Sequence, residues 1–267
     1  MHPLIMGSLS WIEYQQRLQD EAIVFIPCGA LEQHGPHLPL GTDALLSTSV
    51  AQSVAEKIDG IVAPTVSYGY KSQPKSGGGQ HFPGTTSLDG NSLSQLIRDI
   101  VRELARQGGT KIAVVNGHYE NQWFLTEGID LAIRDVGSAS TLRVMRLEYW
   151  EFLTPDILAK VFLEGFPGFA LEHAAVIETS LMAHYHPNLV RLDLIPDVAA
   201  AEFPPYDLFP QCSDWVHVSG VLSSAKSASV EKGELMADHI AKGIATALKQ
   251  EFPSLVSVPD MVLNQKA

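Results

Sequence analysis

The chain has few cysteines, few basic residues and no long apolar run. Two cysteines, Cys28 and Cys212, cannot build the disulfide framework of a small secreted domain, so a reducing cytoplasm is the expected location. Lys and Arg number 18 against 30 Asp and Glu, and the net charge of −12 argues against nucleic acid or an anionic membrane as a partner. No run reaches the roughly 18 apolar residues of a membrane span, and the N-terminus lacks a signal-peptide pattern. With 45% hydrophobic content, residues 1–267 are expected to form a single domain that acts on a small molecule.

Strand-like and helix-like segments alternate along the chain. From Asp43 onward, apolar residues recur every fourth position as far as Ile58, which predicts an amphipathic helix, and two similar helices are predicted after Gly90 and after Glu234. This alternation predicts an α/β fold with layers of helix, largely parallel sheet and helix. The predicted strands are 22–28, 61–66, 111–115 and 141–147.

Two polar clusters follow predicted strands. EQHGPHLPLGTD, residues 32–43, comes after the first strand, and NGHYEN, residues 116–121, comes after the third. Loops at the carboxyl ends of parallel strands converge, so the clusters are expected to meet. In an extended chain, side chains two residues apart point to the same face, so a pair of side chains from each cluster could bind the same metal site. The candidate metal ligands are Glu32, His34, Asp43, His118 and Glu120.

These residue types indicate a catalytic metal site rather than a structural one. Neutral imidazole and carboxylate suit zinc and manganese, whereas structural zinc favours thiolates. Five ligands exceed what one catalytic metal needs, but would serve two metals about 3.5 to 4 Å apart, with Asp43 as the bridge. A single His or Glu at a strand end is more often a cap. Here two clusters carry the same types of side chain at strand ends, which favours metal binding. Without a cation or solvent to compensate them, so many ionisable groups would repel one another.

Two further segments carry chemistry. The loop over residues 68–85 combines three consecutive glycines with Ser76, which could aim donors at a ligand, although a flexible surface loop is the alternative. It does not match the order of a phosphate-binding P-loop. The segment 165–173 ends in His173 and leads into a predicted helix carrying Glu178. A histidine so placed can be held in one tautomer and shuttle protons, or can simply cap the helix.

The run of motifs over nearly the whole chain resembles the creatininase family. The most specific segments are EQHGPHLPLGTD, YGYKSQPKSGGGQHFPGTTSLDG, NGHYENQ, the Tyr149-Trp150 pair, FPPYDLFP and LSSAKSASVEKGEL. The resemblance implies a hydrolase with two divalent ions per subunit, zinc or manganese, assembled as a homohexamer. It also implies that water opens the cyclic amide of creatinine to give creatine, reversibly.

The resemblance also assigns roles to residues. One ion would be held by Glu32 and His118, the other by His34 and Glu120, with Asp43 between them. His173 would deliver a proton to the departing ring nitrogen, supported by Glu178, and Glu120 would share in catalysis. The residues expected to contact substrate are Ser76, Tyr119, Trp150, Phe169 and Glu172.

The chain departs from creatininase proper at Phe169, where a second tryptophan would be expected on the loop over the substrate. Phe keeps an aromatic wall but loses the indole N–H. A relative of creatininase acting on another small cyclic amide or a formamide is therefore a second hypothesis. A third is a metal-stabilised scaffold without activity, which the presence of every expected ligand disfavours.

Overall fold

A computed structural model describes residues 4–137 and 140–252. Its centre is a four-stranded, fully parallel sheet with the order β2-β1-β3-β4. The strands are β1 (Val24–Cys28), β2 (Ile61–Val62), β3 (Lys111–Asn116) and β4 (Arg143–Glu148). The predicted α/β fold with a parallel sheet is confirmed.

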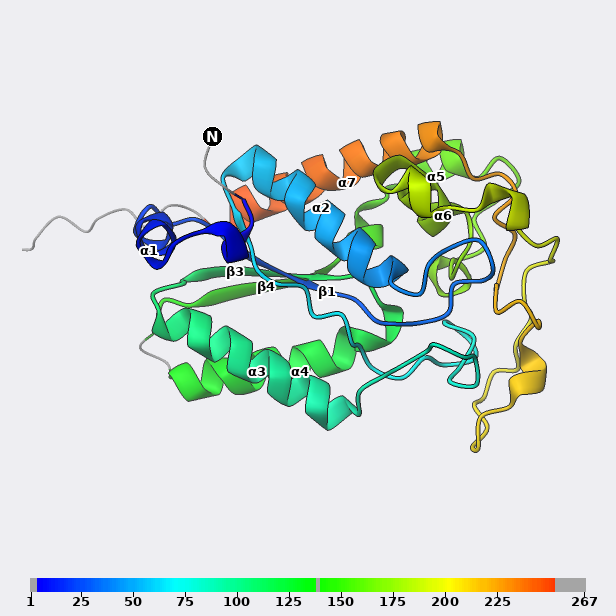
Figure 1. The fold of residues 1–267 in the computed structure, drawn as a ribbon, viewed down its shortest axis with the longest axis horizontal. Coiled ribbons are helices and arrows are strands. Elements are labelled where there is room, and N and C mark those ends of the chain that lie inside the picture. The colour runs from blue at the N-terminus through cyan, green and yellow to red at the C-terminus, as the bar shows by residue number, and fades with distance from the viewer. Residues whose placement is uncertain (1–3, 138–139, 253–267) are drawn as a thin grey trace, which may run out of the picture.

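Helices cover both faces of this sheet (Figure 1). Side chains of a strand alternate between faces, so Phe25 packs with α2 and α7, whereas Val24 and Ile26 pack with α3 and α4. Both faces are buried, as expected of a parallel sheet. Across the described residues, every helix is too short or too polar to span a lipid bilayer. The helices are α1 (Trp11–Gln19), α2 (Thr42–Ile58), α3 (Gly90–Arg106), α4 (Gln122–Val136), α5 (Pro155–Val161), α6 (Val176–Tyr185) and α7 (Val230–Glu251).

Most element boundaries lie close to the predicted ones, with two exceptions. The strand predicted over 61–66 ends at Val62. Pro64 has no N–H to donate, so regular pairing stops there. It resumes only as an isolated bridge between Val66 and Cys28. The helix predicted after Glu234 in fact begins at Val230, where the Ser229 side chain accepts a hydrogen bond from the Lys232 N–H.

The order of the strands places a switch point between β1 and β3. From β1 the chain crosses through α2 to β2 on one side, and from β2 it crosses through α3 to β3 on the other side. Connections leaving in opposite directions open a crevice at the carboxyl ends of the two central strands. Residues Gly29–Asp43 follow β1 and residues Gly117–Asn121 follow β3, so both polar clusters lie at this crevice.

Candidate functional site

The first turn of α2 packs directly against the ends of β1 and β3. Gly29 and Gly117 follow the last paired residues of the two strands, Cys28 and Asn116. A Cβ on Gly29 would lie 2.2 Å from the Ala44 nitrogen, and one on Gly117 would lie 2.4 Å from the Asp43 carbonyl oxygen. Only glycine permits this approach, which places the Asp43 side chain between the two polar clusters.

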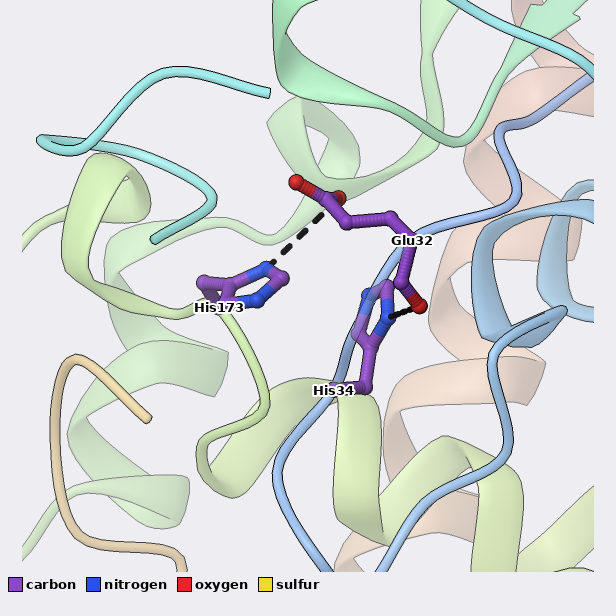
Figure 2. A group of neighbouring side chains, drawn as sticks. All are labelled: Glu32, His34 and His173. Atoms are coloured by element: carbon purple, nitrogen blue, oxygen red, sulfur yellow. Dashed lines mark hydrogen bonds and ion pairs between the residues drawn. The ribbon is translucent and has the colours of Figure 1, made fainter. Parts of the chain in front are cut away.

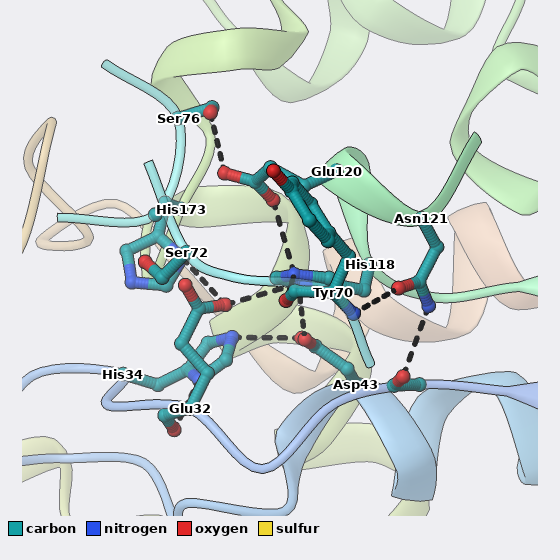
Figure 3. A network of polar contacts seen from close by, with 12 residues as sticks. Glu32, His34, Asp43, Tyr70, Ser72, Ser76, His118, Glu120, Asn121 and His173 are labelled. Atoms are coloured by element: carbon teal, nitrogen blue, oxygen red, sulfur yellow. Dashed lines mark hydrogen bonds and ion pairs between the residues drawn. The ribbon is translucent and has the colours of Figure 1, made fainter. Parts of the chain in front are cut away.

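Asp43 lies between two imidazoles (Figure 3). Its Oδ1 is 2.8 Å from His34 Nε2, and its Oδ2 is 2.9 Å from His118 Nδ1. All three side chains are buried. The other nitrogen of each ring meets a backbone carbonyl: His34 Nδ1 lies 3.0 Å from the Glu32 carbonyl oxygen, and His118 Nε2 lies 3.0 Å from that of Tyr70. Such contacts fix the orientation of the rings.

The two glutamates predicted as ligands both lie beside His118. Glu32 Oε2 is 3.1 Å from His118 Nδ1, and Glu120 Oε2 is 3.2 Å from His118 Nε2. Beside His34 the structure places Glu178 instead, with Oε2 3.7 Å from Nε2. The predicted sharing of the five ligands between two ions therefore remains a prediction. Among the residues that the structure describes, three groups of side chains could each hold an ion: Glu32, His118 and Glu120; His34, Asp43 and Glu178; and Glu32, His34 and His173.

The extended backbone predicted across His118 and Glu120 is wrong. His118 is extended, but residues Tyr119–Asn121 form a 3₁₀ turn. The Asn121 side chain holds this turn in place, donating to the Gly29 carbonyl at 3.0 Å and accepting from the Tyr70 N–H at 2.8 Å (Figure 3). Three separate loops are thereby joined beneath the site.

The chemistry of this cluster fits divalent cations. Glu32 Oε1 is buried without a hydrogen-bond partner. Asp43 Oδ2, Glu120 Oε2 and His34 Nε2 are also buried, and their close contacts with the neighbouring ring and carboxylate atoms are not well-formed hydrogen bonds. Buried polar atoms without partners are costly unless a ligand satisfies them. Each of these atoms belongs to a predicted ligand and is of a type that zinc and manganese prefer.

The electrostatics of the cluster point the same way. Burial disfavours a charged imidazole, yet Asp43 and Glu178 raise the pKa of His34 well above its usual range. Burial likewise opposes charge on His118, but Glu120 and Glu32 raise its pKa well above its usual range. Without cations, the carboxylates thus favour a positive charge on both rings. Divalent ions would supply that positive charge in their place.

A pocket opens above the cluster and is walled by aromatic rings. Tyr119 and Trp150 stack with ring centroids 6.2 Å apart, and Phe169 packs edge-on against Phe166 at 4.8 Å. Ser76, from the glycine-rich loop, donates to Glu120 Oε1 at 2.5 Å. Every residue predicted for the site except His34 lines this pocket: Glu32, Asp43, Ser76, His118, Tyr119, Glu120, Trp150, Phe169, Glu172, His173 and Glu178.

His173 reaches the cluster from the segment before α6. Its Nδ1 lies 3.9 Å from Glu32 Oε2, and its ring centroid lies 4.4 Å from that of His34 (Figure 2). Burial lowers its pKa well below the usual range, and the neighbouring His34 adds to the effect. The next residue, Ala174, has a left-handed φ of 53°, and its N–H donates to Glu178 Oε2 at 2.6 Å. Glu178 therefore holds the backbone beside His173 in a strained conformation.

Glu172 precedes His173 in the chain and lines the same pocket. Its Oε2 accepts a hydrogen bond from the Ile177 N–H at 2.8 Å, while Oε1 is buried without a partner. Burial raises the pKa of this carboxyl to about 8. At neutral pH the group is therefore mostly protonated, and it presents a neutral hydrogen-bonding surface to the pocket.

Sequence reasoning assigned no role to two residues of the site. Gln33 is buried, and its Nε2 lies 2.8 Å from His173 Nε2. Tyr149 is buried under the pocket and meets Trp150 edge-on at 5.2 Å. Gln33 belongs to the EQHGPHLPLGTD motif and Tyr149 to the Tyr149-Trp150 pair, so each lies next in sequence to a residue that was predicted for the site. That neighbourhood is the feature of the sequence that could have identified them.

Known proteins of high similarity share this fold and much of the sequence. Creatinine amidohydrolase of Pseudomonas putida is 48% identical over 254 residues, covering 94% of this chain and 98% of that protein. A mycofactocin precursor peptide peptidase of Mycolicibacterium smegmatis is 30% identical over 241 residues, covering 86% of each. A crystal structure of creatininase superposes with a TM-score of 0.93 at 48% identity, covering 95% of this chain and 99% of the other.

Other solved structures describe the chemistry of those relatives. One is a Glu-to-Gln variant of creatininase complexed with creatine, with a TM-score of 0.92, 48% identity, and coverage of 94% of this chain and 100% of the other. Others are a manganese form and a zinc–zinc form of the enzyme. The family model described as creatinine amidohydrolase matches residues 7–248. The chain is thus a member of the creatininase family.

Proposed function

We propose that this protein is a metal-dependent amidohydrolase that interconverts creatinine and creatine. The observation that carries the proposal is the Asp43 carboxylate placed between the His34 and His118 imidazoles at the floor of an aromatic-walled pocket. The 48% identity to a creatinine amidohydrolase supports the choice of substrate. A related creatininase with bound creatine supports the product.

The reaction is the addition of water across one amide bond. The water oxygen joins the carbonyl carbon of the ring, the bond from that carbon to the ring nitrogen breaks, and one proton of the water ends on the departing nitrogen. Two divalent cations, held by Glu32, His34, Asp43, His118 and Glu120, would make a water molecule more acidic and polarise the carbonyl group. Zinc and manganese forms of related creatininases support these two metals as candidates.

The pocket residues orient the substrate and exclude solvent. Trp150 and Tyr119 offer flat faces on which a planar five-membered ring can stack, and Phe169 adds a third aromatic ring to the lining. Ser76 keeps the carboxylate of Glu120 in place, together with the Gln73 N–H, which donates to the same oxygen at 3.1 Å. Orientation of this kind accounts for a large part of the rate in hydrolytic enzymes.

Other expectations accompany the proposal. We expect one domain over residues 1–267, a homohexamer and a cytoplasmic location, as for an enzyme acting on a small metabolite. Light scattering coupled to size exclusion would measure the assembly. A monomer at micromolar concentration would refute the hexamer without touching the catalytic proposal.

The direct test is an activity assay on the metal-loaded protein. Purified protein is stripped with chelator, reloaded with zinc or manganese, and incubated with creatinine while creatine is measured. The reverse reaction is run from creatine. Asp43→Ala, which removes the central carboxylate, serves as the matched inactive control. No conversion in either direction by protein with verified metal content would refute the assignment.

Phe169 supports a second candidate substrate class. Its ring packs on Phe166 and offers no N–H to the pocket, so selection of the substrate by a hydrogen bond from this wall is absent. Another small cyclic amide or a formamide would then be accepted. A panel of such amides, assayed beside creatinine, separates the two: a higher kcat/KM for one of them than for creatinine would favour this second class.

A further inference from the structure

One turn of the glycine-rich loop supplies two donors to Glu120 Oε1. The Gln73 N–H donates to this oxygen at 3.1 Å, and the Ser76 hydroxyl donates to it at 2.5 Å. The Gly77 N–H donates to the Gln73 carbonyl oxygen at 2.8 Å, so both donors belong to the same tight turn. The other oxygen, Glu120 Oε2, is buried 3.2 Å from His118 Nε2 (Figure 3). The turn therefore determines which oxygen of Glu120 faces the candidate metal ligands.

Lys75, in the same turn, contacts a segment 129 residues further along the chain. Its ammonium group donates to the carbonyl oxygens of Pro204 and Tyr206 at 3.3 and 3.4 Å. It also forms an ion pair with Asp207 Oδ1 at 3.2 Å. An ammonium group has three N–H bonds, and three acceptors surround this one. Lys75 does not line the pocket, so its contacts act on the turn rather than on a bound substrate.

Gln211 makes a second link between the same two segments. Its Nε2 donates to Gln73 Oε1 at 2.9 Å and to the Ser72 carbonyl oxygen at 3.4 Å. The two links lie within or directly after the motif FPPYDLFP, residues 203–210. None of the residues of this motif lines the pocket. Contact with the glycine-rich loop is therefore the way in which this motif can act on the site.

The motif belongs to an arm, which we define as residues 201–222 and which is drawn yellow to orange at the right of Figure 1. The base of the arm is closed by the Ala201 N–H, which donates to the Leu222 carbonyl oxygen at 2.8 Å. In the part of the chain that the structure describes, the hydrogen bonds and ion pairs from residues 204–211 to other segments all go to residues 72–75. The arm is thus fixed at its base and joined further out to the glycine-rich loop.

We propose that Lys75 is a positioning residue: it fastens the turn to the arm, and the turn then holds Glu120 with Oε2 toward the metal centre. A carboxylate with one oxygen fixed by two donors loses little further freedom when its other oxygen binds a cation. Without the Lys75 contacts, the Ser76 hydroxyl and the Gln73 N–H would no longer be held against the carboxylate together. The inference rests on the proposed metal-dependent function and assigns to it the support of one ligand.

The zinc affinity of a lysine variant tests the inference without measuring turnover. Lys75→Met keeps the length of the side chain and removes its charge and its donors. We expect zinc to bind roughly 10-fold more weakly, at the lower end of the effect of residues that orient a metal ligand. The dissociation constant is measured by competition with a chromogenic chelator. Wild-type affinity in Lys75→Met would overturn the inference and leave the proposed function standing.

Lys71→Met is the matched control. Lys71 lies on the same loop, but its ammonium group pairs with Asp89, directly before α3, and not with the arm. The same chemical change at this position should leave the zinc affinity at its wild-type value. An equal loss in both variants would contradict the assignment to Lys75, because it would follow from the loss of any lysine on this loop.

A double variant separates the support of Glu120 from a general loosening of the site. In Glu120→Ala the ligand is already lost, so adding Lys75→Met should weaken the remaining zinc binding no further. A loss as large as in the wild-type background would refute the inference, since Lys75 would then act by another route. In the creatinine assay, Lys75→Met should lower kcat with little change in KM, because Lys75 lies outside the pocket.

Gln211→Met removes the second link and decides the matter if Lys75→Met fails to fold. It should weaken zinc binding in the wild-type background and leave it unchanged in Glu120→Ala. Wild-type zinc affinity in Gln211→Met would then count against the arm as a support of Glu120 and overturn the inference. Zinc binding is measured without substrate, so these outcomes stay readable whether or not creatinine is the substrate.

Discussion

A single methyl group at Gly77 should disrupt the metal centre without altering any ligand. In the structure, a Cβ at this position would lie 2.1 Å from Glu32 Oε1 and 2.6 Å from the Ser72 hydroxyl oxygen. Ordinary contacts begin at 3.4 Å, so the carboxylate must retreat by at least the difference, 1.3 Å. Gly77 itself lies outside the left-handed region, and Gly77→Ala therefore adds a steric change and no backbone strain.

The expected effects follow from that displacement. Overpacking of a buried site costs about 1 to 3 kcal/mol of stability. A ligand displaced by more than 1 Å should weaken zinc binding by roughly 10- to 100-fold and lower the turnover rate by about 100-fold. Zinc affinity is measured by competition with a chromogenic chelator, bound metal by elemental analysis, and stability by thermal unfolding of the metal-free protein.

The matched control is Gly41→Ala. Gly41 lies two residues before Asp43 with an ordinary φ of −91°, and a Cβ there would meet no atom within 4 Å. The control should keep wild-type zinc affinity. If Gly77→Ala also bound zinc as the wild type does, Glu32 would not be held against the glycine-rich loop, and the described geometry of the site would be incorrect.

Three further predictions concern the same site and the core. Excess chelator should lower the unfolding midpoint, and zinc or manganese at about 100 times its dissociation constant should restore about 2.7 kcal/mol, seen by calorimetry; an unchanged midpoint would refute metal binding. Asp43→Asn should reduce zinc content per subunit, because it removes the charge shared by both imidazoles; full zinc content by elemental analysis would show that this charge is not needed. Gly128→Ala should cost about 1 to 3 kcal/mol in denaturant unfolding, since its Cβ would lie 2.6 Å from the Ser94 carbonyl and 2.9 Å from Ile97 Cβ, where α3 and α4 touch. Its kcat should match the wild type, and a large loss of kcat would contradict the separation of this contact from the pocket.

The sequence predicted the elements of the fold better than their arrangement. Apolar runs located the strands because parallel strands are buried on both faces, as Val24 through Cys28 are. Local pattern does not encode which strands pair. The adjacency of β1 and β3, on which the whole site depends, arises from crossovers that leave β1 and β2 in opposite directions. The clusters were expected to converge because carboxyl ends share one edge, a rule that holds for any strand order.

The details of the site depended on contacts that no local pattern contains. The 3₁₀ turn over Tyr119–Asn121 is held by Asn121, whose partners Gly29 and Tyr70 lie far away in sequence. The Gln33 side chain, which lies beside His173, likewise donates to the carbonyl groups of Gly77 and Gly220, from two other loops. Residue type can suggest a ligand, but the atoms that orient it are chosen by tertiary structure.

Charge balance explains why the candidate metal ligands were the part of the site most easily predicted from the sequence. It also favours two cations over one. Glu32, Asp43 and Glu120 place three carboxylates in a buried cluster, and the two imidazoles bring no negative charge. A fourth carboxylate, Glu178, lies 3.7 Å from His34. One divalent ion would therefore leave a net charge of about −2, whereas two would bring it to about zero. A buried excess of acid is costly in any fold, so a sequence that concentrates it at two strand ends indicates the cations that compensate it.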